Sequence, residues 1–255
     1  MSSCLTTSQL AAMARAGVVV LSPHFDDACF SLGGLLQALG SGELLNVFNR
    51  STYLARVPTS LSVPSEAQVQ ALREAEDQAF AARCGLQRSA LGGAEPGFYG
   101  RRPGALDAVE EDIAAMQDAV IAAVLARAPQ SGVRSYLLVP MAVGRHVNHH
   151  AVYAIVARQR AVLAQHFHLC FYEDLPYAND PLQRSARVRT FRAAWPGWRR
   201  KIYEPGWRLK RELIALYPTQ LKREPARWKF RPASGWPWSV HEAVWMEADA
   251  WAALN

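Results

Sequence analysis

The sequence has no long hydrophobic run, no closely spaced cysteines and no recognisable secretion signal. Its longest apolar stretch, residues 119–126, spans eight residues, well short of the roughly 18 needed to cross a membrane. The first 17 residues lack a basic segment followed by an apolar one, so we expect no signal peptide. Four scattered cysteines without a C-x-x-C pair exclude a zinc ribbon and, without a signal, a disulfide framework. These absences predict a cytoplasmic protein with reduced thiols and no membrane span.

The composition is that of a globular protein with an uneven distribution of charge. Half of the 255 residues are hydrophobic and 20% are charged, which excludes a disordered chain and is enough for one domain, with or without a subdomain. Between Arg184 and Arg231 there are 15 Lys and Arg against three acids, whereas the rest carries 13 basic and 19 acidic residues. All eight tryptophans lie from Trp195 onward. We therefore divide the chain into an α/β core, 1–183, and a basic, Trp-rich region, 184–255, which completes that domain or forms a small subdomain.

Short buried strands alternate with helical segments along the core. Apolar runs rich in β-branched residues predict strands at 17–22, 44–48, 135–139 and 168–172. Helical spacing of apolar residues and stretches without Gly or Pro predict helices from about Phe30 to 39 and at 65–83, 106–128 and 148–163. This alternation predicts a Rossmann-like three-layer α/β sandwich with a mostly parallel sheet.

Two polar clusters follow predicted strands. The first contains His24, Asp26 and Asp27, and the second is the segment 145–150, with three histidines. In parallel α/β sheets, ligands bind outside the carboxyl ends of the strands, so the two clusters can meet there. A catalytic zinc site uses three protein ligands of the His or carboxylate type, and His24, Asp27 and His149 fill that requirement. The alternative is structural: an Asp pair at a helix start can serve as an N-cap, and a single His is usually a packed residue.

At this point the sequence resembles a known family. Residues 22–34, SPHFDDACFSLGG, are similar to the HPDD-x(3)-S-x-G-G signature of the PIG-L/LmbE-like zinc deacetylases, and 146–149, HVNH, to the family's second motif, H-x-D-H. Weaker similarities are an arginine-containing helix segment at 72–77 and the late segment 209–220. Together they extend from the first strand to about Gln220.

The resemblance implies a role for each matching residue. The metal ligands would be His24, Asp27 and His149, with Zn²⁺ as the metal and Fe²⁺ as the alternative. Asp26 would be the general base, and a protonated His146 would face the developing oxyanion and serve with Asp26 in protonating the amine. Arg73 falls at a substrate-contacting position, although a solvated helix residue is the structural alternative. The implied reaction is hydrolysis of the N-acyl group, most simply N-acetyl, of an amino sugar or glycoconjugate.

The sequence departs from the family pattern at three positions near the site. Phe25 replaces the usual proline and Ala28 a frequent acid, and neither needs to touch the metal. Asn148 replaces the aspartate of the second motif. An aspartate there would orient the neighbouring imidazole of His146 and favour its charged form, whereas asparagine can orient that ring but supplies no charge. We expect Gly33 and Gly34 to let the first helix pack close to the sheet.

Three other functions remain open. A dinucleotide binder is disfavoured because aspartates, and no G-x-G-x-x-G, follow the first strand. The Arg/Trp-rich region is compatible with nucleic-acid binding, but the same tryptophans can form a core. A non-catalytic family member is suggested by Asn148 alone. If the basic region lies over the site, an anionic substrate is expected to be preferred. The sequence leaves the sugar, the physiological metal and the oligomeric state open.

Overall fold

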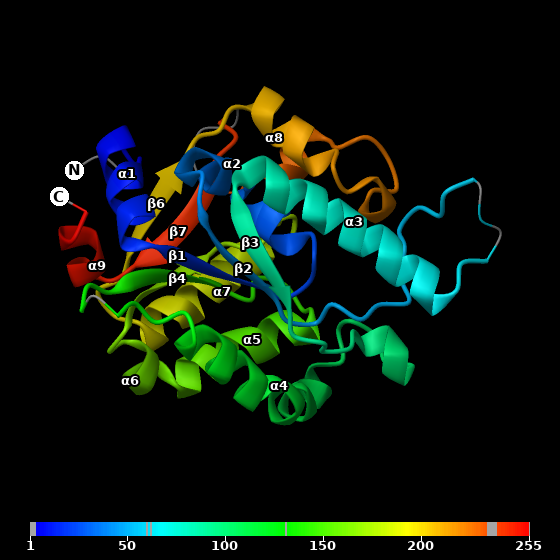
Figure 1. Cartoon of the computed structure of the whole chain (residues 1–255), viewed down its shortest axis with the longest axis horizontal. Coiled ribbons are helices and arrows are strands. Elements are labelled where there is room, and N and C mark those ends of the chain that lie inside the picture. Colours follow the sequence, from blue (N-terminus) through cyan, green and yellow to red (C-terminus); the bar gives the residue numbers. More distant parts are fainter. Residues whose placement is uncertain (1–3, 60, 62, 131, 234–238, 255) are drawn as a thin grey trace.

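The computed structural model describes residues 4–254 except 60, 62, 131 and 234–238. A seven-stranded sheet with the order β3-β2-β1-β4-β5-β7-β6 forms its centre (Figure 1). The strands are β1 (Val18–Ser22), β2 (Gly42–Asn46), β3 (Leu86–Ala90), β4 (Ser135–Pro140), β5 (Phe167–Tyr172), β6 (Arg199–Tyr203) and β7 (Glu242–Met246). The first five pair in parallel, and β7 is antiparallel to both β5 and β6. The predicted α/β class with a mostly parallel sheet is confirmed.

Helices cover both faces of the sheet, as the two hydrophobic clusters show. One face packs against α1 (Thr7–Ala16), α2 (Asp27–Leu39), α3 (Glu66–Cys84), α8 (Trp207–Ile214) and α9 (Ala248–Ala252). The other packs against α4 (Val109–Leu125), α5 (Val147–Arg158), α6 (Arg160–Leu163) and α7 (Pro181–Ala194). Short 3-10 helices lie at Pro96–Tyr99, Leu106–Ala108, Tyr177–Asn179, Pro218–Gln220 and Arg227–Phe230. Among the described residues, no helix is long and apolar enough to span a membrane.

Local sequence signals explain where several elements begin and end. The side chains of Ser65 and Gln68 form a capping box at the start of α3, and Gly85 ends that helix with a left-handed φ of 68°. All five residues of β1 are buried, as expected for a central parallel strand. The predicted strand 44–48 instead lies at 42–46, and the helix predicted from Phe30 begins at Asp27.

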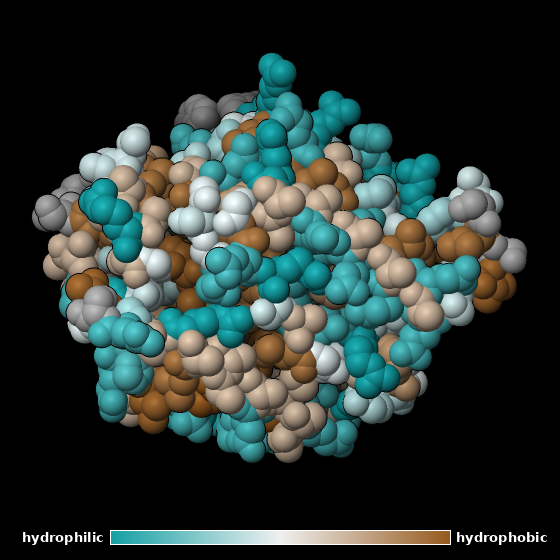
Figure 2. Space-filling view, in the orientation of Figure 1, coloured by the Kyte–Doolittle hydropathy of each residue, from teal (hydrophilic) through white to brown (hydrophobic). Residues whose placement is uncertain are grey.

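The two glycines of the first motif lie where α2 approaches both the sheet and α8. A Cβ on Gly34 would lie 2.3 Å from Pro205 Cβ, and one on Gly33 would lie 3.3 Å from Leu213 Cδ1. The backbone N–H of Gly34 also donates to Glu242 Oε1 of β7 over 2.9 Å, so the helix is close to the sheet as well as to the segment around α8. On the face shown in Figure 2, hydrophilic side chains lie over α8, while its Leu213 and Ile214 are buried against the core.

The late segment similar to the family also has a structural role. Lys210 is buried and forms an ion pair with the buried Glu242. Thr219 donates to Glu76 of α3 from both its backbone N and its hydroxyl, each at 2.7 Å. Tyr217 Oη lies 3.3 Å from Asp77 Oδ1. The contacts of Thr219 and Tyr217 attach the C-terminal part of the chain to α3, and Glu242 attaches it to α2 by accepting from the backbone N–H groups of Gly34 and Leu35.

The C-terminal region contributes two strands to the common sheet and much of the core. Trp195, Trp198 and Trp245 are buried and pack with Phe171 and Phe191. Trp228 is 60% exposed, and two of the eight tryptophans lie outside the described residues. At the three buried positions the aromatic planes are engaged in packing rather than offered to a nucleic acid.

Glu173, directly after β5, connects this region to the core. Its carboxylate accepts 2.7 Å hydrogen bonds from Arg184 and Arg200 and one of 2.9 Å from Trp245 Nε1. Burial alone would raise the pKa of Glu173, but the two guanidinium groups outweigh it and lower the pKa to about 2.

This pKa predicts a specific loss of stability in acid. Because the folded-state pKa of Glu173 is lower than its ordinary 4.5, its contribution to the free energy of unfolding is complete above pH 4.5 and is lost as the pH falls towards 2. The contribution is about 3 kcal/mol at most. Denaturant unfolding between pH 2.5 and 6 is therefore expected to show a shallower pH dependence in Glu173→Gln than in the wild type. Parallel curves would contradict the assignment.

Candidate metal centre

The first polar cluster lies in the tight turn between β1 and α2. The backbone N–H of His24 donates to Asp27 Oδ2 over 2.9 Å, and the backbone N–H of Ala28 donates to Ser22 Oγ over 3.0 Å. These bonds fix the turn and place both His24 and Asp27 in buried positions. Asp26 occupies the N-cap position of α2 but its side chain makes no capping hydrogen bond. The N-cap interpretation therefore does not account for Asp26.

The second cluster lies at the start of α5, after β4, and meets the first across the carboxyl edge of the sheet. The ring centroids of His24, His146 and His149 are 4.5–5.3 Å apart. One ring nitrogen from each of the three lies within 4.8 Å of the others. The two motifs, more than 100 residues apart in the sequence, thus form one site, as their positions after neighbouring parallel strands predicted.

Asp27 lies between two of these imidazoles. Its Oδ2 is 2.8 Å from His24 Nδ1 and 3.1 Å from His149 Nε2. Ligand atoms held tetrahedrally at zinc–ligand distances of 2.0–2.1 Å lie about 3.3 Å apart, so this spacing is close to that of a metal site. His146 Nδ1 is buried and has no hydrogen-bond partner, which calls for a bound group. The residues fit a divalent metal, either through His24, Asp27 and His149 or through the three imidazoles.

His24 is oriented by Asn148, which we expected to orient His146 instead. Its Nε2 lies 2.9 Å from Asn148 Oδ1, and Asn148 Nδ2 donates to Asp112 Oδ2 over 2.7 Å. The amide oxygen requires a proton on His24 Nε2, so Nδ1 is left with its lone pair directed towards Asp27. The expectation that Asn148 orients His146 is therefore wrong: it supports His24. Asp112, which the sequence analysis did not select, holds the amide in place.

The carboxylate of Asp174 orients His149 as Asn148 orients His24. Asp174 Oδ1 accepts from His149 Nδ1 over 2.7 Å, and its Oδ2 accepts from the backbone N of Val143 over 2.8 Å. Because Asp174 holds the proton on Nδ1, Nε2 is the nitrogen of His149 that a metal ion would bind in place of a proton. Burial lowers the pKa of His149, but Asp27 and Asp174 outweigh it and raise the pKa to about 10. The site therefore strongly favours a cation.

His146 lies in a different environment. Burial and the adjacent imidazoles of His24 and His149 hold the pKa of His146 well below its usual range. No carboxylate of the described residues is hydrogen-bonded to its ring. Burial and the two imidazoles therefore disfavour the protonated form expected for His146, and a neutral imidazole can donate one hydrogen bond.

Arg73 and Asp26 form a pair at the edge of the site. Arg73 is buried, which excludes the alternative of a solvated helix residue; it pairs with Glu95 and lies 3.4 Å from Asp26 Oδ1. Burial and the neighbouring Asp27 raise the pKa of Asp26 to about 6, partly offset by Arg73. The Asp26 side chain is 16% exposed, more than that of Asp27. Glu95 had no signal in the sequence.

The support of His24 by Asn148 can be tested. Replacing Asn148 with alanine removes the acceptor at His24 Nε2, so metal affinity is expected to fall by about 10–100-fold, as when a residue that orients a metal-binding histidine is lost. Competition with a chromophoric chelator measures the affinity. Asn179→Ala, a substitution of the same kind outside the cluster, is the control. An unchanged affinity in Asn148→Ala would show that the contact does not support metal binding.

The chain is similar in sequence to a known enzyme. No family model matches it. It is 35% identical over 173 residues to 2′-N-acetylparomamine deacetylase from Streptomyces fradiae, an alignment that covers 65% of this chain and 59% of that enzyme. The chain thus spans less than two thirds of the length of this curated relative.

Two solved structures share the fold of this chain. The deacetylase Dbv21, which acts on an antimicrobial pseudoaglycone, has a TM-score of 0.57 at 20% identity and covers 91% of this chain and 97% of its own. Teicoplanin deacetylase Orf2 in a zinc-inhibited form has a TM-score of 0.59 at 16% identity and covers 90% and 97%. At these identities the similarity shows the α/β fold.

Proposed function

We propose that this protein is a zinc-dependent hydrolase that removes the acetyl group from the nitrogen of an amino sugar or glycoconjugate. The observation that carries the proposal is that His24 Nδ1 and His149 Nε2 lie 2.8 and 3.1 Å from the same oxygen, Asp27 Oδ2. These three atoms would hold the metal. When bound, zinc supplies Lewis acidity, which makes hydroxide available near neutral pH and polarises an amide carbonyl. Fe²⁺ could fill the same position.

The ligand set with Asp27 is favoured over the three imidazoles. Two residues, Asn148 and Asp174, set the tautomers of His24 and His149, and in both the free lone pair is on the nitrogen beside Asp27. The ring of His146 has no such partner. A ligating histidine almost always has a hydrogen-bonded second nitrogen, so His146 is better placed in catalysis than in metal binding.

Asp26 is the proposed general base. Its carboxylate lies next to Asp27 in the chain, is more exposed, and makes no capping bond. It is therefore free to accept the proton of the attacking water and to return it to the departing amine. Arg73, fixed by Glu95, lies at 3.4 Å and stabilises the carboxylate. An amide needs such proton transfer because a free amine anion is a poor leaving group.

His146 is the proposed donor to the tetrahedral oxyanion. Its neutral ring lies beside both other imidazoles, with centroids at 4.5 and 5.3 Å, and its Nδ1 is not bound to protein. A neutral imidazole donates one hydrogen bond, and one donor of this kind typically contributes about 3–4 kcal/mol to the transition state. Since the pKa of His146 is low, we assign proton return to the amine to Asp26.

The proposed substrate class follows from the curated relative, whose name specifies an N-acetyl group on paromamine. The structural neighbours named above act on an antimicrobial pseudoaglycone and on teicoplanin. We therefore propose an N-acetylated amino sugar carried on a larger molecule.

The direct test is acetate release from 2′-N-acetylparomamine. Protein freed of metal by a chelator should be inactive, and one equivalent of Zn²⁺ should restore activity, with Fe²⁺ assayed anaerobically in parallel. N-acetylglucosamine, tested beside it, should be the poorer substrate. Acetate release that does not depend on metal would refute the metal site, and no release from either substrate by the metal-loaded protein would support a non-catalytic member.

A further inference from the structure

A second feature lies apart from the metal centre: a hollow lined by arginines between α7 and the edge of the sheet. The hollow has a volume of about 460 Å³ and is lined by Arg184, Ser185, Val188, Arg189, Arg192, Arg200 and Trp245. Its lining includes none of the histidines or aspartates of the metal centre. We expected the arginines of the basic region to lie over the catalytic site. Four of them, Arg184, Arg189, Arg192 and Arg200, instead line this separate hollow.

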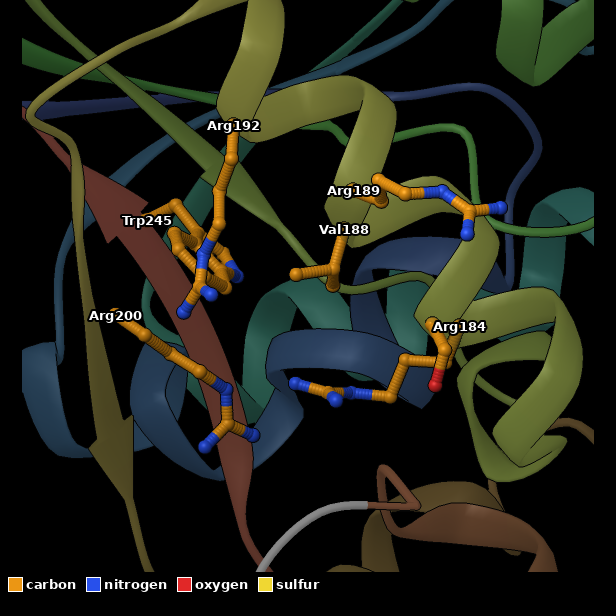
Figure 3. Close-up of a pocket in the computed structure, with 7 residues that line it drawn as sticks. Arg184, Val188, Arg189, Arg192, Arg200 and Trp245 are labelled. Atoms are coloured by element: carbon orange, nitrogen blue, oxygen red, sulfur yellow. The ribbon is translucent and has the colours of Figure 1, made fainter.

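The guanidinium groups are arranged around a common space. Figure 3 shows the side chains of Arg184, Arg192 and Arg200 converging on it in front of Trp245, whereas the head of Arg189 points away. Arg192 lies over the indole ring of Trp245, 5.1 Å from its centroid. The site thus has positive charge from three directions and an aromatic wall.

The positive charge in the hollow exceeds what the protein neutralises. Glu173, beneath the hollow, is shared by Arg184 and Arg200, so one carboxylate faces two guanidinium groups. Within the described residues, neither Arg189 nor Arg192 has an acidic partner. Helix α7 contains four arginines and no acid, although like charges at helical spacing destabilise a helix. An anion in the hollow would remove this cost.

We propose that the hollow binds a phosphate group carried on a small molecule. Glu173 fixes Arg184 by two hydrogen bonds and Arg200 by one, so both guanidinium groups are held in place before a ligand arrives. They supply fixed positive charge, while the fork of Arg192, which makes no ion pair within the described residues, matches the geometry of phosphate oxygens and can bind them in bidentate fashion. The volume falls within the 300–1,000 Å³ range of small-molecule sites and leaves room for the group that bears the phosphate.

The test is calorimetric titration with inorganic phosphate and with glucose 6-phosphate, at constant ionic strength maintained with chloride. We expect saturable binding of both and none of glucose. Arg192→Gln removes an exposed, unpaired guanidinium without disturbing Glu173, so binding should weaken by about 10–100-fold, the loss expected for hydrogen bonds to a charged group. Arg199→Gln is the matched control: it is exposed, carries the same charge change and precedes Arg200 on β6, where successive side chains face opposite sides of the sheet. The phosphate affinity of Arg199→Gln should stay within about two-fold of that of the wild type.

The variants also separate this hollow from the metal centre, which can itself attract phosphate. Phosphate held at the metal would bind Arg192→Gln as tightly as the wild type, and that result would overturn the proposal. The absence of saturable phosphate binding to the wild type would overturn it too. If phosphate binding weakens equally in Arg192→Gln and Arg199→Gln, the effect comes from the overall charge of the protein, which would likewise contradict a specific site.

Discussion

Asp26→Asn is expected to lower kcat by about 10²–10⁴-fold, the usual contribution of a positioned general base, with metal content unchanged. The amide has the shape of the carboxylate but cannot accept the proton of the attacking water. Asp26 makes no capping bond to α2 and its closest ionic contact is Arg73 at 3.4 Å, so the substitution should not disturb the fold. Acetate release and metal analysis on the same preparation measure both effects.

The control for this change is Asp118→Asn on the exposed side of α4, which should keep full activity. If Asp26→Asn keeps its turnover, the general base is another residue. If it loses its metal as well, Asp26 is a ligand and the roles of Asp26 and Asp27 must be exchanged.

The second large effect concerns metal binding. Three variants each remove one proposed ligand: His24→Ala, Asp27→Ala and His149→Ala. Loss of a residue that only orients a ligand lowers metal affinity by about 10–100-fold, and we expect a larger loss of affinity in each of these variants. Activity should fall with metal occupancy. Metal content after dialysis, and affinity by chelator competition, provide the measurement.

His146→Ala is the informative comparison in that series. If His146 is a donor to the oxyanion rather than a ligand, the variant should keep its metal and lose about 10²–10³-fold in kcat. Loss of metal from His146→Ala together with its retention in Asp27→Ala would favour the three-imidazole set.

The two motifs of the site were predictable because their signals are local. His24, Asp26 and Asp27 follow a short buried strand, and His146 and His149 open a helix after another. Parallel pairing of β1 with β4 then brings both to one edge of the sheet. The strand–helix alternation was readable for the same reason, since buried strands and amphipathic helices have characteristic spacing.

The residues that support the site could not be identified in this way. Asp112 lies in an acidic first turn of α4 and resembles a solvated charge, yet it is buried against Asn148. Asp174 and Glu95 likewise gain their roles from contacts with distant segments. The edge strands β3 and β6, with the sequences LQRSA and RRKIY, lack the apolar pattern of a central strand. Packing of the whole chain decides these features.

The partner of Asn148 shows the same limit. Its neighbour in the motif, His146, seemed the natural partner, but the helical backbone directs the amide towards His24 and Asp112. Asparagine is suited to this position because it accepts from His24 Nε2 and donates to Asp112 at once. A carboxylate at 148 would lie against Asp112 instead. The asparagine that replaces the aspartate of the family motif is thus matched by Asp112, to which it donates a hydrogen bond.

The central claim, that His24, Asp27 and His149 form a zinc site, is tested most directly by anomalous diffraction at the zinc edge on crystals with one equivalent of the metal. The account predicts a single strong peak about 2.0–2.2 Å from His24 Nδ1, an Asp27 oxygen and His149 Nε2, with His146 outside bonding distance. A peak bound by His146 in place of Asp27, or no peak among these residues, would contradict it.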